Sequence, residues 1–166
     1  MNYDNTQTLI IAYAASNVVG LLFLWAAFKN TKLARFLFVL LFAWASWINF
    51  TTAWVSPEVY LEYSKKSMGF YSSFINGWFA GHITFFVTVI AVGQGLIALG
   101  MLLKSKWVIL ACIGSIVFLM SIAPLGLYAA FPFSITVSIA AYVIIKKDDK
   151  GFLWKFLNQK LQSSKA

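Results

Sequence analysis

The sequence offers few side chains that could do chemistry. His82 is the only histidine and Cys112 the only cysteine of the chain. These counts exclude an intramolecular disulfide, a C-x-x-C redox pair, a cysteine-based zinc or iron–sulfur site and bis-histidine haem ligation within one chain. No catalytic motif is present either. We therefore expect the isolated chain to carry no haem, flavin or metal centre, and any ligand to be held by hydrogen bonds and apolar contacts.

Four amide or imidazole side chains interrupt long apolar runs, namely those of Asn17, Asn49, His82 and Gln94. In a membrane bundle such groups usually form hydrogen bonds between helices, so a structural role competes with a binding role for each. The same runs contain no Asp, Glu, Lys or Arg. Proton pumps, ion-coupled transporters and retinal proteins usually need at least one such group, so their absence argues against all three classes.

The apolar runs themselves predict the elements that position these groups. The chain has 166 residues, of which 61% are hydrophobic and only 11% charged, too apolar for a soluble domain of this length. A transmembrane helix needs roughly 20 apolar residues. Runs 9–28, 36–55 and 79–103 qualify, and the uncharged run 107–145 is divided by Pro124 and Gly126 into 107–123 and 127–145. The sequence thus predicts an all-α membrane protein, with a bundle of five transmembrane helices in residues 1–150.

Lysine and arginine orient this bundle. Eleven of the thirteen fall on one side if five spans are threaded in order: Lys29, Lys32, Arg35, Lys104, Lys106, Lys146, Lys147, Lys150, Lys155, Lys160 and Lys165. Only Lys65 and Lys66 fall on the other side. The positive-inside rule then predicts an N-terminus outside and a C-terminus in the cytoplasm, in a multi-pass protein of the cell inner membrane. It also explains the net charge of +8 without a nucleic-acid partner.

Two segments lie outside the predicted spans. Residues 56–78 form an aromatic outer loop, in which Ser56-Pro57-Glu58 is typical of a helix start and Gly69 of a helix end. This loop is either an interfacial aromatic belt or a lid over a ligand site. Residues 151–166 form a cytoplasmic tail whose pattern favours an interfacial amphipathic helix, held by apolar insertion and by attraction of lysines to anionic lipid. A docking helix for a partner subunit is the alternative.

The candidate site lies in the outer half of the bundle. Counting about 1.5 Å per residue from the helix ends, Asn49 lies about 9 Å deep, His82 about 5 Å and Gln94 about 22 Å. Asn49 and His82 are therefore close enough in depth to meet, and both can donate to a carbonyl such as that of a quinone. Four aromatic side chains would supply apolar walls: Trp47, Trp54, Trp78 and Phe79.

Residues from about 33 to 145 resemble the DoxX-like family of small bacterial membrane proteins. The similar stretches are LARFLFVLLFAWASWINF, IAVGQGLIALGMLL and ILACIGSIVFLMSIAPLGLYAAFP. This resemblance implies a membrane component linked to quinone-dependent redox, as in the thiosulfate:quinone oxidoreductase subunit. The family is usually four helices, so residues 9–28 would be an added first span. Gln94 stands where an acid is frequent, and no catalytic residue is carried over.

The sequence therefore favours a small non-catalytic or accessory membrane protein that binds a quinone or other apolar ligand. A small oligomeric transporter or channel is one alternative. Another is a lipophile-binding protein similar to the translocator protein, which also has five spans. The partners predicted are the lipid bilayer, that ligand, and a second copy or a larger membrane complex.

The uneven distribution of Lys and Arg predicts a topology that can be tested by labelling. Cysteines introduced singly at Ser67 and Ser164 should differ in their reaction with a membrane-impermeant thiol reagent added from outside. The five-span orientation predicts labelling at Ser67→Cys alone. Equal labelling of both variants from outside would contradict it.

Overall fold

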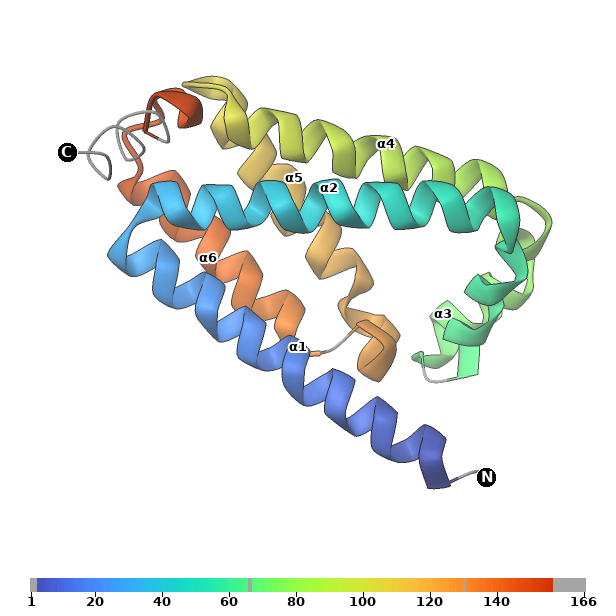
Figure 1. Cartoon of the computed structure of the whole chain (residues 1–166). Coiled ribbons are helices and arrows are strands. Elements are labelled where there is room, and N and C mark those ends of the chain that lie inside the picture. Colours follow the sequence, from blue (N-terminus) through green and yellow to red (C-terminus); the bar gives the residue numbers. More distant parts are fainter. Residues whose placement is uncertain (1–2, 66, 130, 157–166) are drawn as a thin grey trace.

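A computed structural model describes residues 3–65, 67–129 and 131–156, and within these ranges every regular element is a helix. The long helices are α1 (Tyr3–Lys29), α2 (Thr31–Val55), α4 (Ile83–Leu102), α5 (Lys106–Ile122) and α6 (Phe133–Lys147). Between α2 and α4 lie the short elements η1 (Pro57–Lys65), α3 (Gly69–Asn76) and η2 (Trp78–Gly81), and η3 (Ala123–Ala129) follows α5. Figure 1 shows α2 and α4 side by side, with α1, α5 and α6 on one side of this pair.

Four helical segments in the described part of the chain are long and apolar enough to cross a membrane: Ile10–Lys29, Thr31–Val55, Ile83–Leu102 and Lys106–Gly126. They confirm the prediction of a multi-pass membrane protein and match the first four predicted spans to within a few residues. The fifth predicted span, 127–145, begins later, at Phe133. Its 15 residues cover about 22 Å at the helical rise, less than the roughly 30 Å of bilayer hydrocarbon.

A tight turn explains the late start of α6. Gly126 has φ 65°, a left-handed conformation that glycine adopts at little cost. The carbonyl of Gly126 accepts a hydrogen bond from the Phe131 amide at 3.2 Å. Pro132 then stands immediately before the helix, so it does not kink the interior of α6. The residues that the sequence assigns to the start of a fifth span thus form the turn between α5 and α6.

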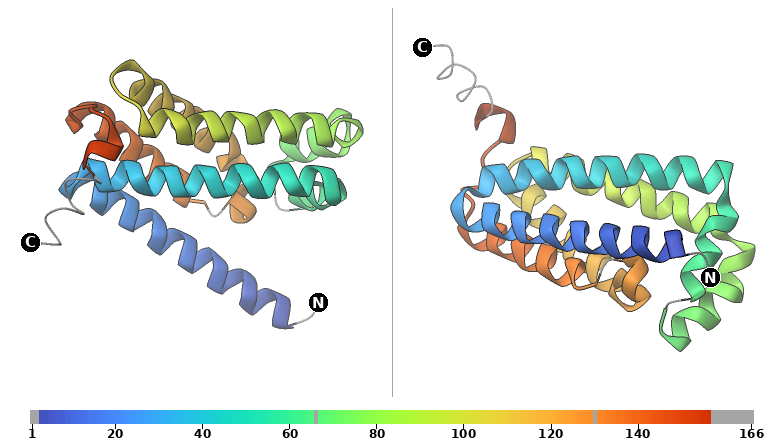
Figure 2. Two further views of the ribbon diagram at one scale, coloured as in Figure 1. Left: turned by 45° about the horizontal axis from the view of Figure 1, so that its top comes forward. Right: turned by 60° about the horizontal axis from the view of Figure 1, so that its bottom comes forward.

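The first helix is only partly packed. Phe23, Ala26 and Ala27 are buried, and all three lie in the last two turns of α1. Ile10 and Ile11, near its other end, are 61% and 68% exposed. Figures 1 and 2 show the reason, because α1 diverges from α2 with distance from the turn at Asn30. Lipid is the natural environment for the exposed apolar part of this helix.

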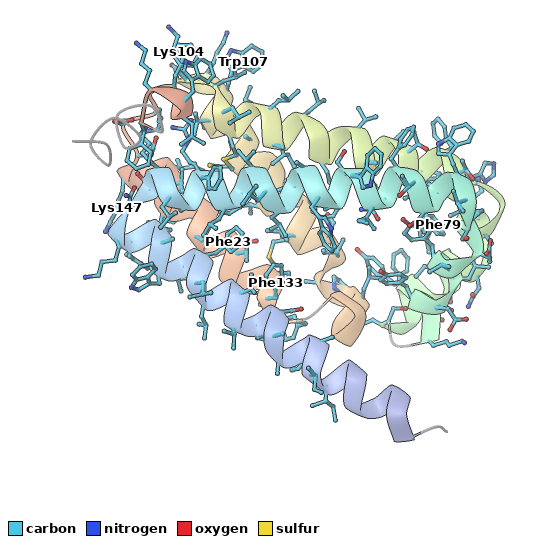
Figure 3. All side chains as sticks on the ribbon, viewed as in Figure 1. Phe23, Phe79, Lys104, Trp107, Phe133 and Lys147 are labelled. Atoms are coloured by element: carbon cyan, nitrogen blue, oxygen red, sulfur yellow. The ribbon has the colours of Figure 1, made fainter. Side chains whose placement is uncertain are left out.

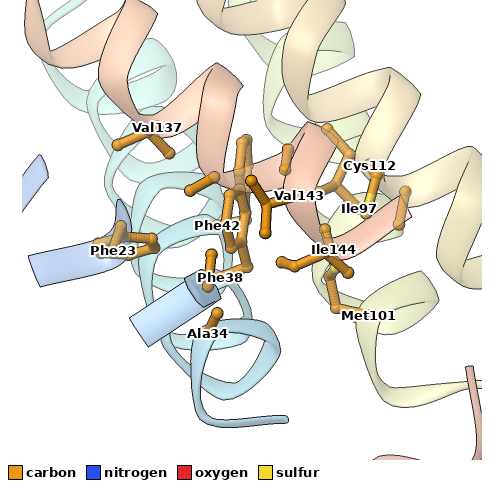
Figure 4. Close-up of a cluster of buried hydrophobic side chains, with 14 of the residues drawn as sticks. Phe23, Ala34, Phe38, Phe42, Ile97, Met101, Cys112, Val137, Val143 and Ile144 are labelled. Carbon is orange, nitrogen blue, oxygen red and sulfur yellow. The ribbon is translucent and has the colours of Figure 1, made fainter. Parts of the chain in front are cut away.

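The dry core occupies the half of the bundle near that turn. Its centre is a row of phenylalanines from three helices: ring centroids are 5.1 Å apart for Phe23 and Phe38, 6.1 Å for Phe38 and Phe42, and 5.9 Å for Phe42 and Phe118. Met101 and Ile144, both fully buried, close the core from α4 and α6 (Figure 4). This half of the bundle is therefore closely packed among the described side chains.

Arg35 lies at the edge of this core and is completely buried. Its Nη1 donates to Asp148 Oδ1 at 3.0 Å and to the Gly151 carbonyl at 2.8 Å. Its Nε and Nη2 donate to the Met101 carbonyl at 3.0 and 2.6 Å, and Nη2 also donates to that of Leu103 at 2.8 Å. One side chain thus joins the start of α2, the end of α4 and the segment after α6.

Asp148 completes the other half of this arrangement. Its Oδ2 accepts from Thr31 Oγ1 at 2.7 Å, and its Oδ1 accepts from the Lys150 amide at 2.6 Å and from Lys32 Nζ at 3.2 Å. A buried charge needs such partners, because removing a carboxylate from water is costly. We call Arg35, Asp148 and their hydrogen-bond partners the Arg35 network.

The sequence predicts that Arg35 lies outside the second span, and the structure corrects this. Asn30 caps α2, since its side-chain oxygen accepts from the amides of Lys32 and Leu33 at 3.1 and 3.2 Å. The helix therefore begins at Thr31, five residues before the predicted start at residue 36. Arg35 falls in its second turn, inside the bundle.

The predicted amphipathic tail, 151–166, lies mostly outside the described residues. Within its described part, Leu153 is fully buried and Trp154 is 42% exposed. The rings of Phe152 and Trp154 stack with centroids 4.2 Å apart. The start of the tail is thus anchored to the bundle through Leu153.

The Arg35 network predicts that substitutions of two adjacent aspartates lower the free energy of unfolding by very different amounts. Asp148→Asn leaves a buried guanidinium without its counter-charge and should lower the free energy of unfolding by about 3–5 kcal/mol. Asp149→Asn is the matched control: its side chain is 74% exposed and accepts from Lys32 and from the Gly151 amide, so the loss should stay below about 1 kcal/mol. Unfolding in mixed detergent micelles measures both, and equal losses would show that the network does not hold the bundle.

Candidate functional site: a cavity at the end opposite the Arg35 network

A cavity of about 850 Å³ lies in the half of the bundle away from the Arg35 network. Its walls come from all five long helices and from η1, α3, η2 and η3, and Phe79 and Phe133, labelled in Figure 3, are two of the lining residues. Most of the lining is apolar: Ala15, Val19, Leu41, Phe42, Trp44, Ala45, Phe74, Ile75, Phe79, Val87, Ile90, Phe118, Leu119, Ile122, Leu125 and Phe133. The size lies within the roughly 300–1,000 Å³ typical of small-molecule sites.

The lengths of the helices explain the cavity. Helix α2 has 25 residues and α6 has 15, a difference of about 15 Å at the helical rise. The α5–α6 hairpin therefore turns back well before the far end of α2. Phe118, Leu119 and Leu125, at the tip of this hairpin, form part of the cavity wall.

The segment from η1 to η2 covers the open end. Tyr60, Tyr63, Tyr71 and Phe74 line the cavity from this segment. The Tyr71 hydroxyl donates to the Ser121 carbonyl at 2.8 Å, and the Met68 amide donates to the Pro124 carbonyl at 3.2 Å. These two bonds join the segment to the end of α5 and to η3. The segment therefore lies over the cavity, and we call its described residues, 57–65 and 67–81, the lid.

Within the lid, one sequence-based prediction is confirmed and one is wrong. Pro57 is the first residue of η1, as its position after Ser56 predicts. Gly69 was expected to end a helix and instead begins α3. Glycine is tolerated at a helix start, because the cost of its flexibility is greatest in the helix interior.

A chain of hydrogen bonds runs along the cavity wall. The Tyr60 hydroxyl donates to Asn49 Oδ1 at 2.9 Å, and Asn49 Nδ2 donates to Gln94 Oε1, also at 2.9 Å. Burial raises the pKa of the Tyr60 phenol, and the neighbouring Tyr63 adds to this shift. Tyr60 therefore stays protonated at physiological pH and acts as the donor that fixes the direction of the chain.

This chain ends in free donors. The Gln94 side chain is only 2% exposed and lines the cavity. Its Oε1 is occupied by Asn49, and no acceptor for its Nε2 group is found among the described residues. This group is not among the fully buried unpartnered polar atoms of the described residues, so part of its surface stays accessible. An acceptor in the cavity would gain a hydrogen bond there, worth about 1 kcal/mol. Gln94 is thus the residue around which a ligand site would form.

The hydrogen bond between Asn49 and Gln94 was not predicted, because the depths in the membrane that the sequence gives for these two residues differ by too much. Two bonds set the register of the antiparallel helices: Thr84 Oγ1 to the Ala53 carbonyl at 3.0 Å and Ser46 Oγ to the Ala91 carbonyl at 2.7 Å. From the Ala53–Thr84 level, Asn49 is about 6 Å and Gln94 about 15 Å along the helices. Side chains lean toward the N-terminus of their own helix, so in an antiparallel pair these two converge and close the gap.

The structure does not bring Asn49 and His82 together. His82 is exposed at the start of α4, where its Nδ1 lies 2.9 Å from the Trp78 carbonyl. Of the six predicted ligand-binding residues, only Asn49 and Phe79 line the cavity. Trp54 and Trp78 are 65% and 58% exposed, and Trp47 lines a different groove between α2 and α4.

The residues that complete the site are Gln94, Tyr60, Tyr63 and Tyr71. Gln94 had a signal in the sequence, because it lies between Gly93 and Gly95, but its depth argued against a role beside Asn49. The three tyrosines had no such signal in the sequence, because nothing in the lid sequence shows which aromatic rings face inward.

The lining residues define what the cavity can do. No Asp, Glu, His, Cys, Lys or Arg is among them, and the described residues hold no cluster of three or more potential metal-ligating side chains of His, Cys, Asp and Glu. The Tyr60 and Tyr71 hydroxyls already donate to Asn49 and to the Ser121 carbonyl, so the donor that the site offers is the Gln94 amide. A donor in a largely apolar cavity suits binding of a largely apolar molecule with a hydrogen-bond acceptor.

Comparison with known proteins adds no relative. No family model, no curated protein and no solved structure matches the chain. The resemblance to DoxX-like proteins therefore stays a prediction from the sequence.

The hydrogen-bond chain predicts different costs for two substitutions. Asn49→Ala removes its bonds to Tyr60 and Gln94, and at about 0.6 kcal/mol per bond within a membrane it should lower stability by about 1 kcal/mol. His82→Ala, at an exposed position, should change stability by less than about 0.5 kcal/mol. Thermal unfolding in detergent would compare the two. A larger loss for His82→Ala would argue against this arrangement.

Proposed function

We propose that this protein is a small non-catalytic or accessory membrane protein that binds an apolar ligand in the cavity between the lid and the core. The ligand carries at least one carbonyl or ether oxygen, and a quinone is the class that fits best. The observation that carries this proposal is the Gln94 amide, which lines a largely apolar cavity and whose Nε2 group has no acceptor among the described residues.

The apolar part of the lining supports a ligand with an apolar body. A quinone ring would lie among aromatic side chains such as Phe79, Phe118 and Phe133, while one carbonyl accepts from Gln94. The divergence of α1 favours access from the bilayer, since Ala15, Ser16 and Val19 line the cavity in the part of the helix that has left α2. A lipid-soluble molecule could then reach the site without crossing water.

Transport through the bundle is less well supported. The cavity ends at Phe42 and Leu119, and beyond them Phe38, Met101 and Ile144 are fully buried in the dry core. A path across the membrane would need this core to separate, and the Arg35 network closes its far edge. The packing therefore favours binding over passage.

Topology and location belong to the same proposal. We place the N-terminus outside, the lid on the outer face and the C-terminus in the cytoplasm of a bacterial inner membrane. Helix α6 then completes a five-helix bundle. The support is the separation of charge: Lys104 and Lys147 lie at the end of the bundle opposite Phe79 (Figure 3), as the positive-inside rule requires of a cytoplasmic face.

The proposal is tested by ligand-dependent thermal stability. A soluble quinone analogue should raise the melting temperature of the wild-type protein in detergent. Gln94→Met keeps the length of the side chain but removes both donors, so binding should weaken about fivefold, as expected for one hydrogen bond of about 1 kcal/mol. The shift at a fixed concentration of the analogue should fall accordingly.

His82→Ala is the matched control, because His82 lies on the same helix but does not line the cavity. It should give the wild-type shift. No shift in the wild type, or the same shift in Gln94→Met, would mean that the amide chain serves only to hold the helices.

A further inference from the structure

A groove, which Trp47 lines, lies on the opposite face of the α2–α4 pair. This groove has a volume of about 420 Å³, and its sides include Val39, Trp47 and Phe50 of α2 and Leu99 and Leu102 of α4. Trp47 and Leu99 are 68% and 58% exposed, so the described chain leaves this face uncovered. We propose that the groove binds one acyl chain of an anionic phospholipid, with the phosphate at Lys104 and Lys106. This inference does not rest on the proposed function.

The length and position of the groove fit a lipid in one leaflet. From Phe50 to Val39 it follows α2 for eleven residues, about 16 Å at the helical rise. Half of a bilayer's hydrocarbon is about 15 Å thick. The groove ends at Leu102, in the last turn of α4, at the same end of the bundle as the Arg35 network. An acyl chain in this groove would thus have its headgroup at the basic end.

Lys104 and Lys106 lie two and four residues after Leu102, where the groove ends. Their ammonium groups lie 5.0 Å from the Phe152 ring centroid and 5.6 Å from that of Trp107. In the described residues, no carboxylate lies within ion-pair distance of either lysine. The acids of this end, Asp148 and Asp149, are already paired with Arg35 and Lys32.

The Arg35 network also fixes the place of these lysines. Arg35 donates to the carbonyls of Met101 and Leu103, and the Ser105 amide donates to the Lys150 carbonyl at 2.7 Å. The backbone on both sides of Lys104 is therefore held to the bundle. A positive charge held beside the end of an apolar groove recognises a molecule that is anionic at one end and apolar along its length.

Native mass spectrometry of the full chain in detergent tests this proposal, with dioleoyl phosphatidylglycerol as the anionic lipid and dioleoyl phosphatidylcholine as its zwitterionic match. Each lysine near a phosphate should contribute about fivefold in affinity, so the wild type should prefer the anionic lipid by about 25-fold. Lys104→Gln with Lys106→Gln should remove most of this preference. Lys146→Gln with Lys147→Gln makes the same charge change at the same end, away from the groove, and should keep it.

A second pair of protein variants tests the predicted contact between the groove and the acyl chain. Ala43 is exposed and lines the groove, so Ala43→Phe should fill it and weaken binding of both lipids. Ala14→Phe adds the same bulk at an exposed position of α1 outside the groove and should leave the binding of both lipids unchanged. Equal affinity of the wild type for both lipids, an equal loss in the two lysine pairs, or unchanged binding in Ala43→Phe would each overturn the proposal.

Discussion

The buried pairing of Arg35 with Asp148 is the interaction on which the arrangement of this bundle depends. An unpaired guanidinium at this position would be too costly to bury, so α2, the end of α4 and the segment after α6 must meet around it. This requirement brings together segments that are more than sixty residues apart in sequence. Against this fixed end the phenylalanines around Phe38 form a dry core. One charged side chain thus organises the packing of a chain that is otherwise strongly apolar.

The other end of the bundle is shaped by what this arrangement leaves unfilled. The α5–α6 hairpin starts from the closed end and, being short, stops before the end of α2 and α4. The remaining space is covered by the lid and lined by the chain from Tyr60 through Asn49 to Gln94. One end is therefore closed by satisfied polar groups, and the other contains a cavity with a donor left over. This contrast is the physical basis for placing ligand binding at the lid end.

The sequence predicted the four long apolar helices well, because hydrophobic length is a property of single segments. It failed where two distant segments determine the outcome. Arg35 resembled any interfacial arginine, since its partner Asp148 lies 113 positions away and shows no pattern that links the two. Asn49 does line the cavity, but the sequence pairs it with His82, because depth counted along separate helices ignores the direction in which side chains lean. Gln94 could be assigned to the site only once the register of α2 and α4 was known.

Infrared difference spectroscopy measures directly the proposed hydrogen bond from the Gln94 amide to the carbonyl of a bound ligand. A quinone analogue labelled with ¹³C at one carbonyl would be compared in empty detergent micelles, with the wild-type protein and with Gln94→Met. The account predicts a carbonyl stretch at lower frequency with the wild type than in micelles, and a return toward the micelle frequency with the variant. A bound analogue whose carbonyl frequency is the same in the wild type and in Gln94→Met would contradict the account.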